Sequence, residues 1–283
     1  MIESLDRHLD AILACPTAPF REIAVLRVID AFAAERGPRV RLRIDPCGNR
    51  ILAVRGARAG RAAPTIAFTA HLDHPAFVRG DDGTWELLGR VLPECLPGAA
   101  LRFHREDASA AGTGRVVDVE SRDGRVLARL ARDGGAEKPG DFATFDFPAL
   151  TRAADRLTGR VCDDLMGAIA ILAAIDETLA REPGASWLAV FTRAEEVGLV
   201  GATLLMKGRL VPRTIPVVGL ECSAARGGNA VVGDGPIVRV GDKVATFDPG
   251  TTAFLRDCAE SIAREDSTFR WQRRLMQGGT CES

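Results

Sequence analysis

The sequence predicts an α/β domain that is interrupted by a small all-β domain. Apolar strands alternate with helices in residues 1–75 and again in residues 155–283, as in a mixed sheet flanked by helices. Between these parts, residues 76–154 form short apolar segments split by glycine, proline and aspartate, without a helix of core length. That texture is typical of a β-barrel or β-sandwich, so residues 76–154 are predicted to be an insertion.

The composition is that of an ordinary globular protein. Of the 283 residues, 46% are hydrophobic, and the formal net charge is −1 without any basic or acidic block. Neither a nucleic acid nor a membrane is therefore implied as a partner. The seven cysteines are widely spaced and never form a C-x-x-C pair, which argues against a disulfide framework. We expect a cytoplasmic protein, since the N-terminus also has no long apolar stretch.

The first part of the chain predicts two helices and then three strands. Apolar spacing indicates helices over residues 4–14 and 20–35. Alternation indicates a strand pair over residues 40–44 and 51–54. The more evenly apolar run 65–69 predicts a strand that is covered on both faces. This last strand leads into a His-x-Asp sequence.

The alternation of strand and helix resumes after the insertion. The run 168–179 is apolar on nearly every side and predicts a helix packed in the interior. A strand over residues 187–191, a helix over 199–210 and a strand over 215–220 follow. A further helix is expected from about residue 249 to 264.

Ligand-type residues stand at the ends of the predicted elements. They are His71, Asp163, Glu196 and Glu221. Each has an ordinary structural explanation by itself, because Asp-Asp is a common helix cap and Glu-Glu usually lies in a solvated loop. In open α/β sheets, however, sites form beyond the carboxyl ends of the strands. We therefore expect these four side chains to converge on a metal site.

The spacing of these residues suggests distinct roles. Residues i and i+2 of an extended segment point the same way, so Asp73 could accept a hydrogen bond from the ring of His71. Of the adjacent pair Glu195 and Glu196, one could ligate a metal while the other serves as a general base. Two divalent ions could share Asp163, and nitrogen and oxygen donors without thiolate suit Zn, Co or Mn.

The other histidines receive weaker interpretations. His74 is expected to be a loop histidine or a residue of a substrate pocket, with structural use favoured. His8 is placed in a surface helix and His104 in the insertion, and neither is assigned a role.

Four segments carry a resemblance to a known family. They read A-H-L-D-H at 70–74, C-D-D-L-M-G at 162–167, F-T-R-A-E-E-V-G-L-V-G-A at 191–202 and G-L-E-C-S at 219–223. In order and spacing they resemble the co-catalytic dinuclear metallo-aminopeptidases of the glutamyl, deblocking and tetrahedral kind, some of which have been called endoglucanases. The resemblance implies a zinc-peptidase-like catalytic domain, with an inserted β domain through which subunits assemble into a homo-oligomer.

The resemblance also implies a role for each site residue. His71, Asp163 and Glu221 would hold one metal ion, and Asp163 and Glu196 would hold the other. Glu195 would be the general base, and Asp73 would orient His71. The implied reaction is hydrolysis of N-terminal residues from peptides, with two divalent ions per subunit.

The sequence departs from the family pattern in three places. The family usually has Arg where Leu165 stands and Asp where Glu221 stands. The remaining ligand of the second metal is a histidine beyond a Gly-Gly-Thr sequence, and this chain has no histidine after His104. The C-terminal part of the catalytic domain is therefore expected to be missing and activity to be impaired. Two other functions stay open: deacylation of N-acyl amino acids, and a non-catalytic or regulatory homologue.

Overall fold

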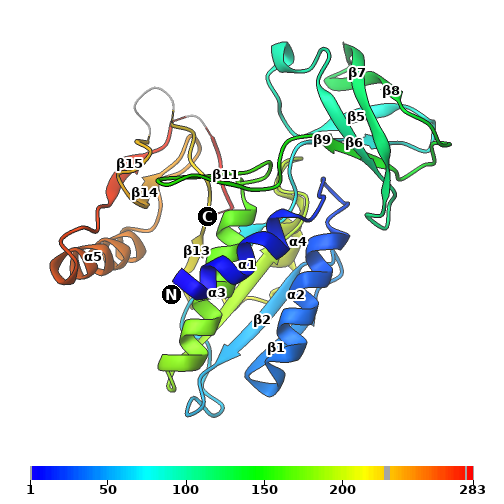
Figure 1. Ribbon diagram of the computed structural model, residues 1–283. Helices are drawn as coiled ribbons and strands as arrows, with labels where there is room; N and C mark the ends of the chain where they lie inside the picture. The colour runs from blue at the N-terminus through cyan, green and yellow to red at the C-terminus, as the bar shows by residue number, and fades with distance from the viewer. Residues whose placement is uncertain (1, 226–229, 278, 283) are drawn as a thin grey trace. The chain divides into compact units, whose positions relative to one another are not determined.

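The computed structural model describes residues 2–225, 230–277 and 279–282. The chain divides into two compact units, Met1–Leu220 and Glu221–Ser283. The first unit contains a five-stranded sheet with helices and a closed β-barrel (Figure 1). The predicted fold class, a mixed sheet flanked by helices with an inserted small β domain, is confirmed, and the β domain is a barrel.

The five-stranded sheet brings three strand ends to one edge. In spatial order its strands are β1 (Val40–Ile44), β2 (Arg50–Arg55), β12 (Ser186–Thr192), β3 (Ala67–His71) and β13 (Val217–Gly219). Strands β3, β12 and β13 are parallel to one another, whereas β2 runs antiparallel to β12 and β1 runs antiparallel to β2. The carboxyl ends of β3, β12 and β13 therefore share an edge, which is where such sheets place their sites.

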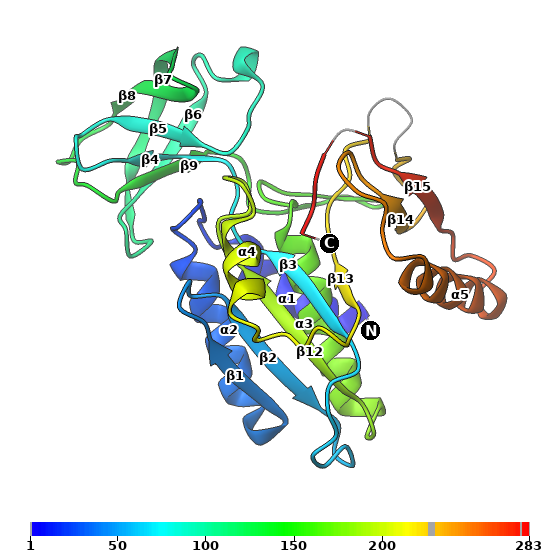
Figure 2. The ribbon, with the colours of Figure 1, turned by 180° about the vertical axis from the view of Figure 1, so that it is seen from behind.

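Helices cover both faces of this sheet, as the two views in Figures 1 and 2 show. On one face lie α1 (Ile2–Leu13), α2 (Ile23–Glu35) and α3 (Leu165–Arg181), and on the other lies α4 (Val200–Lys207). Strand β12 serves both faces, because Trp187, Ala189 and Phe191 pack with the α1–α3 side. Leu188 and Val190 pack with Leu205 of α4. This period of two is what a strand requires.

Helix α3 contains the predicted run 168–179 and extends beyond it at both ends. The side chain of Asp164 caps its first turn by accepting a hydrogen bond from the Gly167 N–H at 3.2 Å. Ile169 and Leu172, both fully buried, pack against the sheet, and burial of each such side chain stabilises the fold by about 1.5–3 kcal/mol.

The prediction of a surface position for His8 is wrong. The side chain is buried, and its Nε2 lies 2.9 Å from Asp176 Oδ2 on α3. Its ring packs edge-on against Phe32 of α2. The periodicity of the helix alone did not show this, because the partners are on two other helices.

The barrel is formed by strands between Ala76 and Phe145. Its strands, in order around the barrel, are β4 (Ala76–Arg79), β5 (Trp85–Leu88), β8 (Arg125–Arg132), β7 (Ala110–Arg122), β6 (Ala100–His104) and β9 (Phe142–Phe145). Phe77, Trp85, Leu101 and Phe103 fill its core. A short antiparallel pair, β10 (Thr151–Arg152) and β11 (Leu157–Thr158), follows it. The described residues also include two short 3-10 helices, Gly37–Arg39 and Pro93–Cys95.

The second unit has its own small sheet. Its helix α5 (Pro249–Glu265) matches the prediction, and β14 (Ile237–Gly241) pairs in parallel with β15 (Gln272–Leu275). The buried Gln272 side chain exchanges hydrogen bonds with the backbone of Val231. In the described part of the chain, no helix has the length and continuous apolar character that spanning a bilayer requires.

His104 is a buried titratable group in the barrel. Its ring stacks on Phe142, and Nε2 lies 3.2 Å from Thr144 Oγ1. Burial, with smaller contributions from Arg160 and Arg102, lowers the pKa of His104 from 6.5 to about 4. The folded barrel therefore holds a neutral imidazole at pH values where the unfolded chain holds a charged one.

We predict that the protein loses stability as the pH falls from about 6.5 to about 4. The folded pKa of His104 is depressed, so its full contribution is present above the unfolded pKa and is lost through this window. The separation of the two pKa values corresponds to about 3 kcal/mol at most. Denaturant unfolding followed by Trp85 fluorescence, with Trp187 and Trp271 replaced by Phe, measures it. His104→Gln should remove most of this dependence, and an unchanged dependence in that variant would assign it to other groups.

Candidate active site

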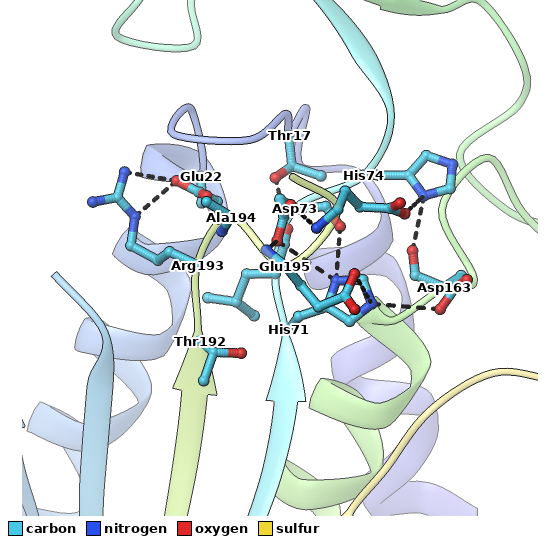
Figure 3. Close-up of polar contacts among 12 residues, drawn as sticks. Thr17, Glu22, His71, Asp73, His74, Asp163, Thr192, Arg193, Ala194 and Glu195 are labelled. Atoms are coloured by element: carbon cyan, nitrogen blue, oxygen red, sulfur yellow. Dashed lines mark hydrogen bonds and ion pairs between the residues drawn. The ribbon is translucent and has the colours of Figure 1, made fainter. Parts of the chain in front are cut away.

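The predicted site residues of the first unit meet at the shared edge of the sheet (Figure 3). His71 is the last residue of β3 and pairs with Thr192 at the end of β12. Glu195 and Glu196 follow β12, and Asp163 precedes α3. Because β3 and β12 are parallel neighbours, the residues after His71 and the residues after Thr192 leave the sheet side by side.

Asp73 joins the two strand ends. Its carboxylate is fully buried, and its two oxygens accept hydrogen bonds from the backbone N–H groups of Glu195 at 2.9 Å and Glu196 at 3.0 Å. The predicted contact with His71 also exists, but its hydrogen bond runs from Nδ1 to the backbone carbonyl of Asp73 at 3.2 Å. The carboxylate itself lies 3.6 Å from Nδ1. Sequence reasoning missed the backbone bonds, because two residues of a distant loop make them.

The hydrogen bond to the Asp73 carbonyl determines which ring nitrogen of His71 faces the carboxylates. Nδ1 donates there, so Nε2 presents its lone pair to the carboxylates on the other side. Nε2 lies 3.5 Å from Asp163 Oδ1 and 3.9 Å from Glu195 Oε2. A neutral imidazole surrounded by carboxylates is a donor set that suits a divalent cation.

The two roles predicted for the Asp163–Asp164 pair, helix cap and metal ligand, concern different residues. Asp164 is fully buried and caps α3, as the ordinary explanation of the pair expects. Asp163 lies toward His71 instead, with an exposed fraction of 45% for its side chain. The peptide bond between them is cis.

His74 contacts the same segment. Its Nδ1 lies 2.9 Å from the Asp163 carbonyl oxygen and 3.9 Å from Glu196 Oε1. Its other ring nitrogen points away from Asp163 (Figure 3). Burial lowers the pKa of His74, and the Asp163 carboxylate opposes this. The favoured structural use of His74 agrees with this bond to the backbone.

The side chain of Glu196 is crowded by other charges. Burial, together with the carboxylates of Glu195, Asp163 and Asp73 and against an opposing contribution from His71, raises its pKa from 4.5 to about 8. A divalent cation would remove this repulsion. The spacing also fits, because donors about 2.1 Å from a tetrahedral zinc ion lie about 3.4 Å apart, and Nε2 of His71 and Oδ1 of Asp163 are 3.5 Å apart.

Glu221 follows directly on β13 and is the first residue of the second unit. The preceding residue, Leu220, donates its N–H to the Thr69 carbonyl of β3 at 2.8 Å. Within the second unit, the backbone carbonyl of Glu221 accepts a hydrogen bond from Arg239. Its role as a metal ligand stays a prediction.

Two buried residues that the sequence did not single out also reach the Glu195–Glu196 loop. They are Glu22 and Asn49, whose side chains bind the backbone of residues 193, 194 and 201. Neither belongs to a motif of ligand type, and both are about 150 residues or more away along the chain. Only the folded chain brings them to the loop.

Comparison with known proteins places the chain among peptidases. The sequence model of the M42 glutamyl aminopeptidase family matches residues 132–281, more than half of the chain. A search of curated protein sequences gives no match. Many solved structures do match.

Three of these structures show the same fold. A TET aminopeptidase from a marine-sediment Thaumarchaeota archaeon has a TM-score of 0.78 at 16% identity, covering 99% of this chain and 83% of its own. An aminopeptidase from Desulfurococcus kamchatkensis has a TM-score of 0.75 at 20% identity, covering 99% and 81%. The TET1 peptidase of Pyrococcus horikoshii, which assembles into a tetrahedron or an octahedral shell, has a TM-score of 0.72 at 22% identity, covering 98% and 86%.

We predict that Glu196→Gln stabilises the metal-free protein. The folded pKa of Glu196 lies above its unfolded value, so stability is full below pH 4.5 and is lost as the pH rises through about 8. A neutral amide lacks this loss, so the free energy of unfolding at pH 8 should rise by about 4 kcal/mol at most. Denaturant unfolding in the presence of a chelator measures it, with the exposed Glu265→Gln as the control. Equal stability of the two variants would contradict the expectation.

Proposed function

The chain belongs to the M42 glutamyl aminopeptidase family, and we propose that it removes N-terminal residues from peptides in a metal-dependent reaction. The observation that supports this most is the meeting of His71, Asp163 and the Glu195–Glu196 pair beyond two parallel strands. These groups offer one imidazole nitrogen and several carboxylate oxygens, without a thiolate. Such a set is typical of a hydrolytic metal site.

We propose that His71, Asp163 and Glu221 hold one divalent ion, and that Asp163 and Glu196 hold a second. The donors suit Zn, Co or Mn. The second ion should be held more weakly, because the chain supplies His71 to the first set and no further histidine follows His104 in the 283 residues. Loss of even an indirect contact to a ligand can weaken metal binding about 10-fold to 100-fold.

In the proposed mechanism, Glu195 moves the protons. Its Oε2 lies 3.9 Å from Nε2 of His71, and its side chain is only 13% exposed. Glu195 is therefore close to the proposed reacting groups and largely shielded from water. It would take a proton from the attacking water and deliver it to the departing amine nitrogen. A bound divalent ion would supply Lewis-acid activation of the peptide carbonyl and of water. Asp73 would keep Glu195 in place by accepting a hydrogen bond from the backbone N–H of Glu195.

Two alternatives use the same residues differently. A related amidohydrolase would cleave N-acyl amino acids at this site, and a non-catalytic homologue would keep the fold without turnover. Assays of the purified protein with free peptides and with N-acyl amino acids, after loading with Zn, Co or Mn, separate the three. Cleavage of the peptides from their amino ends supports the proposal, and cleavage of acyl amino acids alone replaces it.

The roles of the two glutamates should be separable. Glu195→Gln is expected to keep metal and lose turnover by about 10²-fold to 10⁴-fold, which is the contribution of a positioned acid–base group. Glu196→Gln is expected to lose metal as well as activity. Elemental analysis of the dialysed proteins and peptide assays measure both. Normal turnover in Glu195→Gln would refute its role as the base.

We further propose that the protein is a cytoplasmic homo-oligomer that assembles through the barrel. The assemblies formed by the Pyrococcus horikoshii relative support self-association, and seven widely spaced cysteines without a C-x-x-C pair suit a reducing compartment. Replacing residues 76–154 with a short Gly/Ser linker should then lower the mass of the particle in light scattering. An unchanged mass would show that the barrel does not mediate assembly.

A further inference from the structure

The loop that carries Glu195 and Glu196 is held from behind by two buried side chains. It joins β12 to α4, and it contains Ala194 with φ of 53° and Leu199 with φ of 58°. Both lie in the left-handed region, which residues with a side chain disfavour. A loop with this backbone needs partners that hold it.

Glu22, the residue before α2, is the first partner. It is fully buried, and its Oε1 accepts hydrogen bonds from the N–H of Ala194 at 3.1 Å and the N–H of Phe20 at 2.9 Å. Its Oε2 lies 2.7 Å from both Nε and Nη2 of Arg193 (Figure 3). One carboxylate thus holds the side chain of residue 193 and the backbone of residue 194.

Asn49 is the second partner. Its Oδ1 accepts the N–H of Arg193 at 3.0 Å, and its Nδ2 donates to the Gly201 carbonyl at 2.9 Å. The backbone is packed tightly here, because a Cβ at Gly201 would lie 2.3 Å from the Arg193 carbonyl oxygen. Both ends of the loop are therefore fixed by buried side chains from outside it.

The far side of the same loop meets the site. The residues directly after Ala194 donate their N–H groups to Asp73, and their carboxylates lie near the two histidines. A shift at residue 194 would therefore be transmitted to Glu195 and Glu196 within one or two peptide bonds. The hydrogen bonds of the Glu22 side chain to the loop are those with Arg193 and Ala194, and its carboxylate also repels that of Asp73.

We propose that Glu22 is a positioning residue, which sets the direction of Glu195 and Glu196 by holding Arg193 and Ala194. The catalytic part of this inference rests on the proposed function. The structural part, that Glu22 fixes the backbone of the loop, does not.

The chemistry requires a carboxylate at this place. Glu22 accepts from two backbone N–H groups and from a guanidinium, and it donates none. A glutamine would offer one accepting oxygen and would turn an amide NH₂ toward a donor. Glu22→Gln keeps the shape of the side chain and removes this pattern.

Asp176→Asn is the matched control. Asp176 lies on α3, and its Oδ1 accepts a hydrogen bond from Arg36 Nε at 2.8 Å and lies 2.6 Å from Arg36 Nη2. Arg36 caps the C-terminal end of α2, whereas Glu22 precedes its N-terminal end. Both variants therefore weaken an arginine–carboxylate pair at one end of α2, but only Glu22→Gln loses a contact to the Glu195–Glu196 loop.

Hydrogen exchange of the metal-free protein tests the structural part. Glu22→Gln should speed the exchange of the Glu195 and Glu196 amides by about 10-fold to 100-fold, the effect of losing one hydrogen bond to a charged group. Asp176→Asn should leave these amides unchanged. Arg193→Gln should act like Glu22→Gln, and the double variant should add little, because the two residues act as a unit. Unchanged amides in folded Glu22→Gln would overturn the inference.

Metal binding and kinetics test the catalytic part. Glu22→Gln should weaken Zn binding and lower kcat by about 100-fold, as expected for a small misplacement of reacting groups, while KM changes little. Asp176→Asn should retain both values. If the unaltered chain neither binds Zn nor cleaves peptides, the proposed function fails while the exchange result still stands. Faster exchange with unchanged kcat and Zn affinity would overturn the positioning of the catalytic groups.

Discussion

The site depends on one buried interaction, the acceptance of two backbone N–H groups by the carboxylate of Asp73. Asp73 comes just after β3, and the donors come just after β12, so this bond ties two strand ends that the sheet has already brought side by side. An ionised carboxylate without partners is costly to bury, and two N–H groups stabilise it. Without Asp73, nothing in the sheet itself would turn the Glu195–Glu196 segment toward His71.

This arrangement gathers charges that the fold alone does not favour. Asp73 and the site-facing groups of His71, Glu195 and Glu196 lie in a largely dry region, and the pKa of Glu196 is raised to about 8. The well-packed apolar layers on both faces of β12 provide the rigidity that keeps these groups together. Stability and function therefore pull in opposite directions at this edge of the sheet.

The sequence could predict the elements and the strand-end residues because both signals are local. The apolar run of α3 and the placement of His71 and Glu196 after strands are visible in short windows. The sequence could not predict which of Asp163 and Asp164 caps α3, because this depends on which carboxylate reaches the Gly167 N–H. The sequence did not predict the roles of His8, Glu22 and Asn49. Their hydrogen-bond partners Asp176, Ala194 and Arg193 are between 144 and 172 residues away.

These partners, distant along the chain, also explain how the site residues can be held in place without a bound ligand. The residues that face the proposed metal repel one another, so they cannot fix their own positions. On the other side of the loop, Glu22 pairs with Arg193 and Asn49 makes uncharged contacts. The geometry of the loop is therefore also held from behind, by groups whose pairing does not depend on a cation. A metal that enters finds the imidazole nitrogen and the carboxylates already near one another, and its binding energy is not needed to fold the loop.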